Sequence, residues 1–379
     1  MMKAYSGLRV LDFTTTIAGP HCTRLLADLG AEVIKIEAPA GDMMRTRLPL
    51  RNGASSYFGQ LNAGKKSVVL DLKSGAAVAA VRRLAADADI LVENFRPGVM
   101  QRLGLDYAVL GKVNRRLIYC SISGYGQTGP CADMPAYAPV IHASSGFDLA
   151  NLAYQQGRQR PDHCGVYVAD VLAGTYALAA IGAALHQRQA TGEGQHLDVS
   201  MLESMLSLTL TELQTAQFEV PPPPARPIFG PVATGDGFIS MAVASERTFQ
   251  GMAAAAGRVD WITDPRFAKY LDRRANWGAL MDEFEAWSKS LSSAECLRQL
   301  DRHSVPAAAY RTVRQAMADP QLEHRGAFGE VEDAGGRFKV LNPPFRMSAA
   351  STTVGARVPG LGEHTHEVLG TAKIAAADL

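Results

Sequence analysis

The chain has 379 residues, of which 47% are hydrophobic and 20% are charged, and its formal net charge is +1. This length exceeds what one hydrophobic core usually supports, so we expect two domains. Proteins dedicated to nucleic acids or membrane surfaces need a strong basic excess, so the balanced charge argues against both classes. A small-molecule substrate is expected instead.

The N-terminal segment lacks the long apolar run and the small-residue cleavage site of a signal peptide. No later stretch is expected to stay apolar over the roughly 20 residues of a membrane span, so a cytoplasmic protein is expected. The cysteines are odd in number, scattered and without a C-x-x-C pair, which predicts reduced thiols rather than disulfides or a zinc site. They are Cys22, Cys120, Cys131, Cys164 and Cys296.

The first half of the chain alternates short β-type apolar runs with helical patterns, which predicts βαβ units around a mostly parallel sheet. Between the first two strands, Leu25, Leu26 and Leu29 share one helix face, and Gly30 stands where a left-handed cap would end that helix. A second helix is predicted over 75–88. The expected strands are Leu8–Thr14, Glu32–Glu37, Ser67–Asp71, Ile90–Asn94 and Leu117–Ser123.

A long helix is predicted from Asp170 to Gln189, and its almost wholly apolar inner side implies burial. A strand at His196–Val199 and a helix at about Met201–Phe218 follow. That helix ends at Pro221–Pro224, a stiff and extended run that marks a linker.

Beyond the proline run, a strand at Phe238–Ala244 and a mainly helical stretch predict a smaller α+β domain, and the tail reads as strand-like and loop-rich over 337–347 and 360–369. The expected organisation is a large domain of residues 1–200 completed by 327–379, a linker at 201–226 and a small domain at 227–326.

The segment Gly124–Gly129 has the G-x-G-x-x-G spacing of a dinucleotide site and follows a predicted strand. Such a site needs a helix to open at the third glycine, facing the pyrophosphate. Here Pro130 follows, and the residues up to Pro135 lack helical periodicity. The motif is therefore interpreted as a loop without NAD.

A set of short motifs runs through nearly the whole chain. They are Leu8–Phe13, Ala18–Pro20, Leu29–Glu37 with Gly41-Asp42, Val92–Gly98, Gly124–Gly129, Thr191–Gln195, Val305–Ala307, Asp319-Pro320, Asn342–Phe345 and Leu361–Thr365. Each is weak alone, but in this order and spacing they resemble the class III CoA-transferase family, which includes formyl-CoA transferases and α-methylacyl-CoA racemases.

The resemblance implies an α/β fold with a Rossmann-like large domain plus a smaller α+β domain, and two chains threaded through one another as an interlocked homodimer. It implies acyl-CoA and carboxylic acid substrates. Coenzyme A would be part of the substrate, with no permanently bound cofactor and no metal.

In family transferases the nucleophile is an aspartate in a G-D or A-D step before an apolar helix, and here that step is Ala169-Asp170. The residues point to the same place, because the helix dipole and unpaired backbone N–H groups favour an ionised carboxylate at a helix N-terminus. A purely structural N-cap is the alternative role for Asp170. The resemblance implies the catalytic one.

By resemblance, the CoA-contacting positions come from several separate segments. Formyl-CoA transferases have a glutamine and an arginine where this chain has Ile17 and Ala38, which argues against a formyl or oxalyl substrate. Arg45, Arg47 and Lys73 are alternative partners for the CoA phosphates. The implied positions are Ile17, Ala18, Ala38, Leu70, Asp71, Leu72, Lys73, Asn94, Phe95, Arg96, Arg102, Met134, Pro135, Ala136 and Tyr137.

Three functions stay open. The favoured one is a CoA-transferase that moves CoA from an acyl-CoA donor to a short organic acid, with dicarboxylic acids among the candidates and an aspartyl anhydride as intermediate. A racemase would need a second acid–base group, and the family's histidine is replaced by Tyr137, with His142 the nearest substitute. The third is a non-catalytic protein that binds CoA esters.

Overall fold

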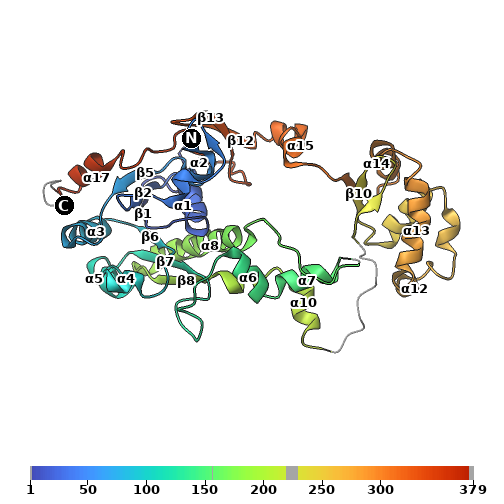
Figure 1. Ribbon diagram of the computed structural model, residues 1–379, viewed down its shortest axis with the longest axis horizontal. Helices are drawn as coiled ribbons and strands as arrows, with labels where there is room; N and C mark the ends of the chain where they lie inside the picture. Colours follow the sequence, from blue (N-terminus) through green and yellow to red (C-terminus); the bar gives the residue numbers. More distant parts are fainter. Residues whose placement is uncertain (1, 156, 219–228, 375–379) are drawn as a thin grey trace. The chain divides into compact units, whose positions relative to one another are not determined.

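The computed structural model describes residues 2–155, 157–218 and 229–374. Their contacts divide the chain into two compact units, whose elements are labelled in Figure 1. The first unit comprises the described residues of Met1–Phe147, His163–Leu210 and Pro320–Leu379, and the second those of Asp148–Asp162 and Thr211–Asp319.

A six-stranded parallel sheet forms the centre of the first unit, in the order β5-β2-β1-β6-β7-β8. The chain builds outward from β1 through β2 to β5 and then returns to add β6, β7 and β8 on the other side, so the order reverses between β1 and β6. Open α/β sheets bind ligands at such a reversal, beyond the carboxyl ends of the strands. The strands are β1 (Arg9–Asp12), β2 (Glu32–Glu37), β5 (Lys66–Val69), β6 (Ile90–Glu93), β7 (Ile118–Ser123) and β8 (His196–Ser200).

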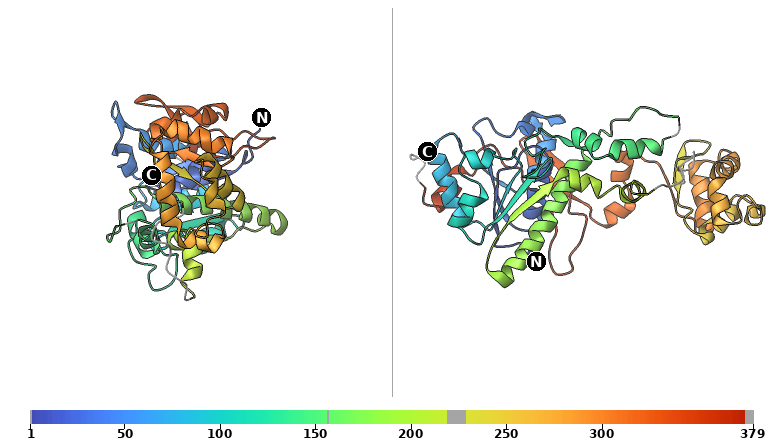
Figure 2. Two further views of the ribbon diagram at one scale, coloured as in Figure 1. Left: turned by 90° about the vertical axis from the view of Figure 1, so that its right-hand side faces the viewer. Right: turned by 90° about the horizontal axis from the view of Figure 1, so that it is seen from below.

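Helices cover both faces of this sheet (Figure 1; Figure 2). Side chains alternate along a strand, so Val10 and Val92 pack with α1 and α8 on one face while Leu11 and Leu91 pack with α3 and α5 on the other. The mixed α/β architecture with a parallel sheet is therefore confirmed. These helices are α1 (Ala18–Asp28), α8 (Val168–Thr191), α3 (Gly75–Ala86) and α5 (Tyr107–Val113).

Shorter elements complete the first unit. Its C-terminal part adds an antiparallel hairpin of β12 and β13 and a final helix, α17. The shorter elements are η1 (Met43–Thr46), β3 (Leu50–Arg51), β4 (Ala54–Ser55), α2 (Ser56–Asn62), α4 (Val99–Arg102), α6 (Ala138–Ser144), α9 (Met201–Leu206), α16 (Pro320–His324), β12 (Phe328–Asp333), β13 (Gly336–Leu341) and α17 (Thr365–Thr371). Helix α7 (Phe147–Ala153) begins at Phe147, the last residue of the unit's first segment.

The second unit has a three-stranded antiparallel sheet and helices around a core that includes Phe249, Trp261 and Phe284. Its elements are α10 (Leu210–Thr215), β9 (Val232–Ala233), β10 (Phe238–Met241), α11 (Glu246–Ala255), η2 (Val259–Ile262), α12 (Tyr270–Ala275), α13 (Trp277–Ser288), α14 (Ser293–Arg302), β11 (Ala307–Ala309) and α15 (Val313–Met317).

Two predicted elements are wrong. The single helix over 201–218 is broken into α9 and α10, where the hydroxyls of Ser207 and Thr209 donate to the backbone carbonyls of Ser204 and Leu206. Such local bonds compete with the regular helical ones. The tail at 360–369, predicted to be strand-like and loop-rich, contains the start of α17, because a short apolar run does not distinguish helix from strand.

The predicted domain boundaries stay a prediction. The compact units are divided differently, since the first includes α9 and the second includes Asp148–Asp162. The proline run Pro221–Pro224 lies outside the described residues.

Helix α8 departs from the expectation that no segment reaches the length of a membrane span. Its 24 residues include an 18-residue window with a mean hydropathy of 1.7, so by length and composition it could cross a membrane. It packs against α1, α9, β7 and β8, with Ala173, Ala177 and Ile181 buried. A core helix passes the same test of length and composition.

Candidate active site

The predicted site residues follow different strands of the sheet. Ile17 and Ala18 come after β1, Ala38 after β2, Leu70–Lys73 after β5, Asn94–Arg96 after β6, and Met134–Tyr137 after β7. Because parallel strands end at the same edge, each of these segments leaves the sheet at its carboxyl edge.

Asp170 is the third residue of α8, and the helix begins two residues before the predicted start. The backbone amide of Ala18, at the start of α1, donates a hydrogen bond to its carboxyl. Burial raises the pKa of Asp170 to about 6, although the bond from Ala18 opposes the shift. The N-cap of α8 is Tyr167, so the alternative of Asp170 as an N-cap does not describe this geometry.

The N-terminus of α1 lacks a cap from its own side chains, since Ile17 stands at the N-cap and makes no side-chain bond. The first amides of a helix have no partner within the helix. Asp170 supplies one from α8. Gly174, one turn further along α8, permits this approach because a Cβ there would lie 2.4 Å from the Ala18 carbonyl oxygen.

Tyr57 lies close enough to Asp170 for its pKa to respond to that charge, and His21 lies beside the next turn of α8. Tyr57 of α2 stacks against Tyr167 with ring centroids 6.5 Å apart, and burial and the charge of Asp170 are among the causes that raise the pKa of Tyr57. Burial lowers the pKa of His21 to about 4, so this imidazole is neutral at physiological pH. It lies beside Gly174 and Thr175 on α8. No motif in the sequence pointed to Tyr57.

His142 is buried and its Nε2 accepts a hydrogen bond of 3.2 Å from the backbone amide of Ala169. Its ring also contacts Phe147. The Nε2 lone pair is therefore used to hold the start of α8, which is a structural role. His163 lies in a loop before α8 and is exposed.

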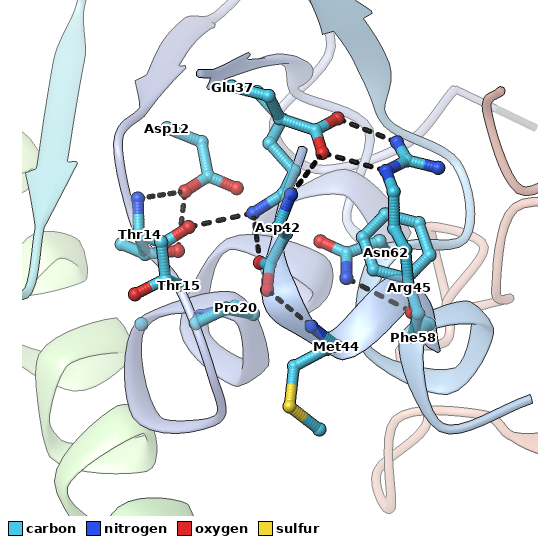
Figure 3. A network of polar contacts seen from close by, with 12 residues as sticks. Asp12, Thr14, Thr15, Pro20, Glu37, Asp42, Met44, Arg45, Phe58 and Asn62 are labelled. Carbon is cyan, nitrogen blue, oxygen red and sulfur yellow. Dashed lines mark hydrogen bonds and ion pairs between the residues drawn. The ribbon is translucent and has the colours of Figure 1, made fainter. Parts of the chain in front are cut away.

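A cluster of buried charges lies under the same edge of the sheet (Figure 3). Lys65 Nζ is 2.9 Å from Asp12 Oδ2, and Lys35 Nζ is 3.0 Å from Asp42 Oδ2. Burial alone would raise the pKa of Asp12, but Lys65 and Lys35 outweigh it and lower the pKa to about 2. Asp12, Lys35, Asp42 and Lys65 are called here the buried charge cluster.

Arg45 adds a third ion pair beside this cluster. Its guanidinium forms two hydrogen bonds with Glu37, of 2.8 and 2.6 Å, and stacks over Phe58 (Figure 3). Such a pair holds the charge of Arg45 inside the protein, which argues against its alternative role as a phosphate partner.

The predicted CoA-contacting residues differ in exposure. Ile17, Ala18 and Leu70 are buried, and Leu72, Asn94, Phe95 and Ala136 are half-buried. The exposed ones are Ala38, Asp71, Lys73, Arg96, Arg102, Met134, Pro135 and Tyr137.

A pocket of about 380 Å³ lies on the α4 and α5 side of the sheet and includes Arg96 in its wall. Ser121 Oγ is 2.9 Å from His196 Nε2 in this pocket. Burial raises the pKa of the neighbouring Glu93 to about 7. Sequence reasoning missed Glu93, Ser121 and His196, because they come from separate strands.

The structure confirms that Gly124–Gly129 is a loop and that no helix opens at its third glycine. Turns follow Gly129, and the next helix, α6, begins only at Ala138. All five cysteines are free thiols, as predicted.

The sequence matches CoA-transferase family III over residues 5–365. The chain therefore belongs to this family, and the resemblance seen in its motifs is confirmed. It is a CoA-transferase, an enzyme whose substrates are CoA thioesters.

Known relatives align over almost the whole chain. The succinate–glutarate CoA-transferase of Agrobacterium fabrum is 33% identical over 380 residues, covering 96% of this chain and 94% of that protein. The succinyl-CoA–D-citramalate CoA-transferase of Chloroflexus aurantiacus is 34% identical over 373 residues, covering 95% and 92%. The crystal structure of a CaiB/BaiF family protein from Brucella suis is 32% identical, covers 98% of this chain and 100% of that one, and has a TM-score of 0.85.

Proposed function

We propose that this enzyme moves CoA from an acyl-CoA donor to a short dicarboxylic acid, with Asp170 as the nucleophile. The observation that carries the proposal is the setting of Asp170: a half-buried carboxyl that accepts a hydrogen bond from Ala18 at the carboxyl edge of the sheet. A carboxylate that is poorly hydrated and held in one orientation is suited to attack a thioester.

In the proposed reaction, Asp170 attacks the thioester carbonyl and expels CoA thiolate, which leaves a mixed anhydride between Asp170 and the acyl group. The thiolate then attacks the aspartyl carbonyl, forming an aspartyl-CoA thioester and releasing the donor acid. The acceptor carboxylate attacks this thioester to give a second anhydride and CoA thiolate. Attack of that thiolate on the acceptor's acyl carbonyl yields the new acyl-CoA and regenerates Asp170. Because water takes no part, the free energy of the thioester is conserved.

The substrate class rests on the two relatives, whose names specify succinate, glutarate and citramalate. All three are dicarboxylic acids. Ile17 and Ala38 stand where formyl-CoA transferases have a glutamine and an arginine, which supports an acid other than formate or oxalate.

The CoA moiety is assigned to the carboxyl edge of the sheet. Lys73, Arg96 and Arg102 are exposed cations in the segments that follow β5 and β6, and phosphates pair with such side chains. Leu72 and Phe95 are half-buried and offer apolar surface to the adenine.

We also propose that the enzyme is cytoplasmic and that two chains form an interlocked homodimer. Its large domain would be Rossmann-like and built from 1–200 and 327–379, with 201–226 as the linker and 227–326 as the small domain. The reversal of strand order between β1 and β6 supports the Rossmann-like assignment.

The decisive experiment incubates the enzyme with an acyl-CoA and then with hydroxylamine, and locates the modified carboxyl by mass spectrometry. Asp170 should be modified in the wild type, and Asp170→Ala should lose transfer while remaining folded. Turnover above about 5% of wild type in Asp170→Ala would contradict the nucleophile assignment. A panel of succinate, glutarate and other acids, with mass detection of new thioesters, tests the substrate class.

The racemase alternative has less support, because the Nε2 of His142 is used by the Ala169 amide and Tyr137 stands at the position of the racemase histidine. A phenol is a poor base at neutral pH. Incubation with (R)-2-methylacyl-CoA in deuterated water should therefore give slow α-deuteration but rapid thioester exchange once acids are added. Rapid deuteration without exchange would reverse this conclusion.

A further inference from the structure

The segment between β1 and α1, residues 13–17, is held at several points and is called here the β1–α1 loop. Asp12 Oδ1 accepts a hydrogen bond of 2.9 Å from the Thr14 amide, and Lys35 Nζ donates one of 2.7 Å to the Thr14 carbonyl. Figure 3 shows Thr14 and Thr15 beside Asp12 in the buried charge cluster. One end of the loop is thus fixed to the sheet.

The middle of the loop is held by Asn94, the residue after β6. Its Oδ1 accepts a hydrogen bond of 2.8 Å from the Thr15 amide, and its Nδ2 donates one of 2.9 Å to the Thr15 carbonyl. The side-chain amide therefore makes a two-way clamp across the point where the strand order reverses. Both of its functional groups already have partners.

The loop needs such restraint because Thr16 has a φ of 69°, in the left-handed region that β-branched residues rarely adopt. A strained backbone conformation of this kind persists only where contacts with the surrounding residues hold it in place. Ala18, two residues later, carries the amide that donates to Asp170. The clamp on Thr15 therefore holds the backbone three residues before that amide.

We propose that Asn94 is a positioning residue for the nucleophile: it holds the β1–α1 loop so that the Ala18 amide meets the Asp170 carboxyl. The inference rests on the proposed role of Asp170. The sequence motif predicted that Asn94 contacts CoA, whereas this inference gives Asn94 a role in positioning Asp170. Loss of the clamp should loosen the Ala18 amide, misplace the carboxylate and weaken the bond that favours its charged form.

The test compares Asn94→Ala with a matched control, Asn114→Ala. Asn114 is also a half-buried asparagine that holds backbone, since its Nδ2 donates to the carbonyls of Ala85 and Ala88 at 3.0 and 2.7 Å. It therefore controls for the general cost of removing such a clamp. Each variant is measured for kcat/KM against pH, for the dissociation constant of free CoA, and for folding by circular dichroism.

Asn94→Ala should lower kcat about tenfold or more, as expected for a misplaced reactive group. The acid limb of kcat/KM, which reports the free enzyme's Asp170, should move up by roughly half a pH unit or more. Tyr57, whose pKa the charge of Asp170 helps to raise, lies on α2 and is not altered in Asn94→Ala. The dissociation constant of CoA should stay within about twofold of the wild type, and Asn114→Ala should move neither the acid limb nor the CoA affinity.

An unmoved acid limb in Asn94→Ala, or a CoA affinity weakened about tenfold with the limb unmoved, would overturn the inference. If Asn94→Ala does not fold, Asn94→Ser replaces it with the same expectations. Loss of the fold in both, with Asn114→Ala intact, would also overturn it, because Asn94 would then be needed for the whole fold. Failure of the proposed function is recognised separately, since hydroxylamine would then leave Asp170 unmodified in the wild type.

Discussion

Burial raises the pKa of Asp170 to about 6, whereas an aspartate in the unfolded chain has its ordinary pKa of 3.8. Between these two values the folded protein keeps a proton that the unfolded chain releases. The free energy of unfolding therefore falls as the pH rises from about 4 to about 6, and stays lower above that range. At neutral pH the charge proposed for catalysis is a cost to stability.

Replacement of Asp170 by Asn should remove that cost. The amide oxygen of Asn can still accept the hydrogen bond from Ala18, but it carries no charge. Asp170→Asn should raise the free energy of unfolding by on the order of 2 kcal/mol at neutral pH, and the difference from wild type should vanish below about pH 4. Urea unfolding at both pH values measures this. A variant less stable than the wild type at neutral pH would contradict the burial argument.

Lys65 and Lys66 are adjacent residues with contrasting surroundings. Lys65 is fully enclosed in the buried charge cluster with Asp12, and burial lowers its pKa to about 8 against the attraction of that carboxylate. Lys66 pairs with Glu32 and Glu367 at the surface, where its side chain is 30% exposed.

Lys65→Met should lower the free energy of unfolding by about 3–5 kcal/mol, because it leaves the carboxylate of Asp12 buried without its partner. Lys66→Met, the matched control, should cost about 1 kcal/mol or less, since solvent screens a surface pair. Urea denaturation of the two variants beside the wild type measures the difference. Equal losses would mean that the cluster is not the buried ion pair described above.

At the scale of elements, the contact between α1 and α8 brings the Ala18 amide to Asp170, and Gly174 is the residue that lets the helices approach. Its absent side chain leaves room for a backbone carbonyl, which is part of α1 and cannot rotate away. A Cβ added at Gly182, two turns further along α8, would meet only the hydroxyl of Tyr5, at 3.3 Å.

Gly174→Ala should lower the free energy of unfolding by about 1–3 kcal/mol through overpacking, and should lower turnover because α8 and Asp170 shift from α1. Gly182→Ala should be neutral or stabilising, since alanine favours a helix over glycine by up to about 1 kcal/mol. Urea unfolding and turnover are measured for both variants. If Gly174→Ala matched Gly182→Ala in both, the close approach would not matter for the site.

The bounds of the buried strands were predicted well from the sequence. β2 matches its predicted bounds, and β6 and β7 each differ by one residue at one end. Strands covered on both faces are rich in apolar residues, although β2 also contains charged ones. The break between α9 and α10 was not predictable from apolar periodicity, since it depends on the hydroxyls of Ser207 and Thr209.

The site was predictable only in part. Asp170 could be selected from its A-D step and the apolar helix after it. Its bond from Ala18, the nearby Tyr57 and the clamp of Asn94 on Thr15 join segments far apart in the chain. No local pattern contains that information, because it arises from strand order and from the crossing of α1 and α8.

At the scale of the whole molecule, apolar side chains are exposed along α8 and the segments beside it. Val171 is 42% exposed and Tyr176 is 44% exposed, although the opposite side of the same helix is buried in the core. Contiguous exposed apolar surface commonly marks a protein interface. The proposed second copy of the chain would cover it. The exposed residues of this kind include Val166, Tyr167, Val171, Tyr176 and Leu208.

Interlocking makes a prediction that ordinary surface association does not. Two chains threaded through one another separate only when at least one unfolds, so the dimer should persist on dilution to nanomolar concentration. In rising urea, loss of the dimer and loss of helical signal should coincide in one transition whose midpoint rises with protein concentration. Sedimentation and circular dichroism on the same samples measure both. A folded monomer at any urea concentration would exclude interlocking, while the reaction at Asp170 would be unaffected, because its known contacts with Ala18 lie within one chain.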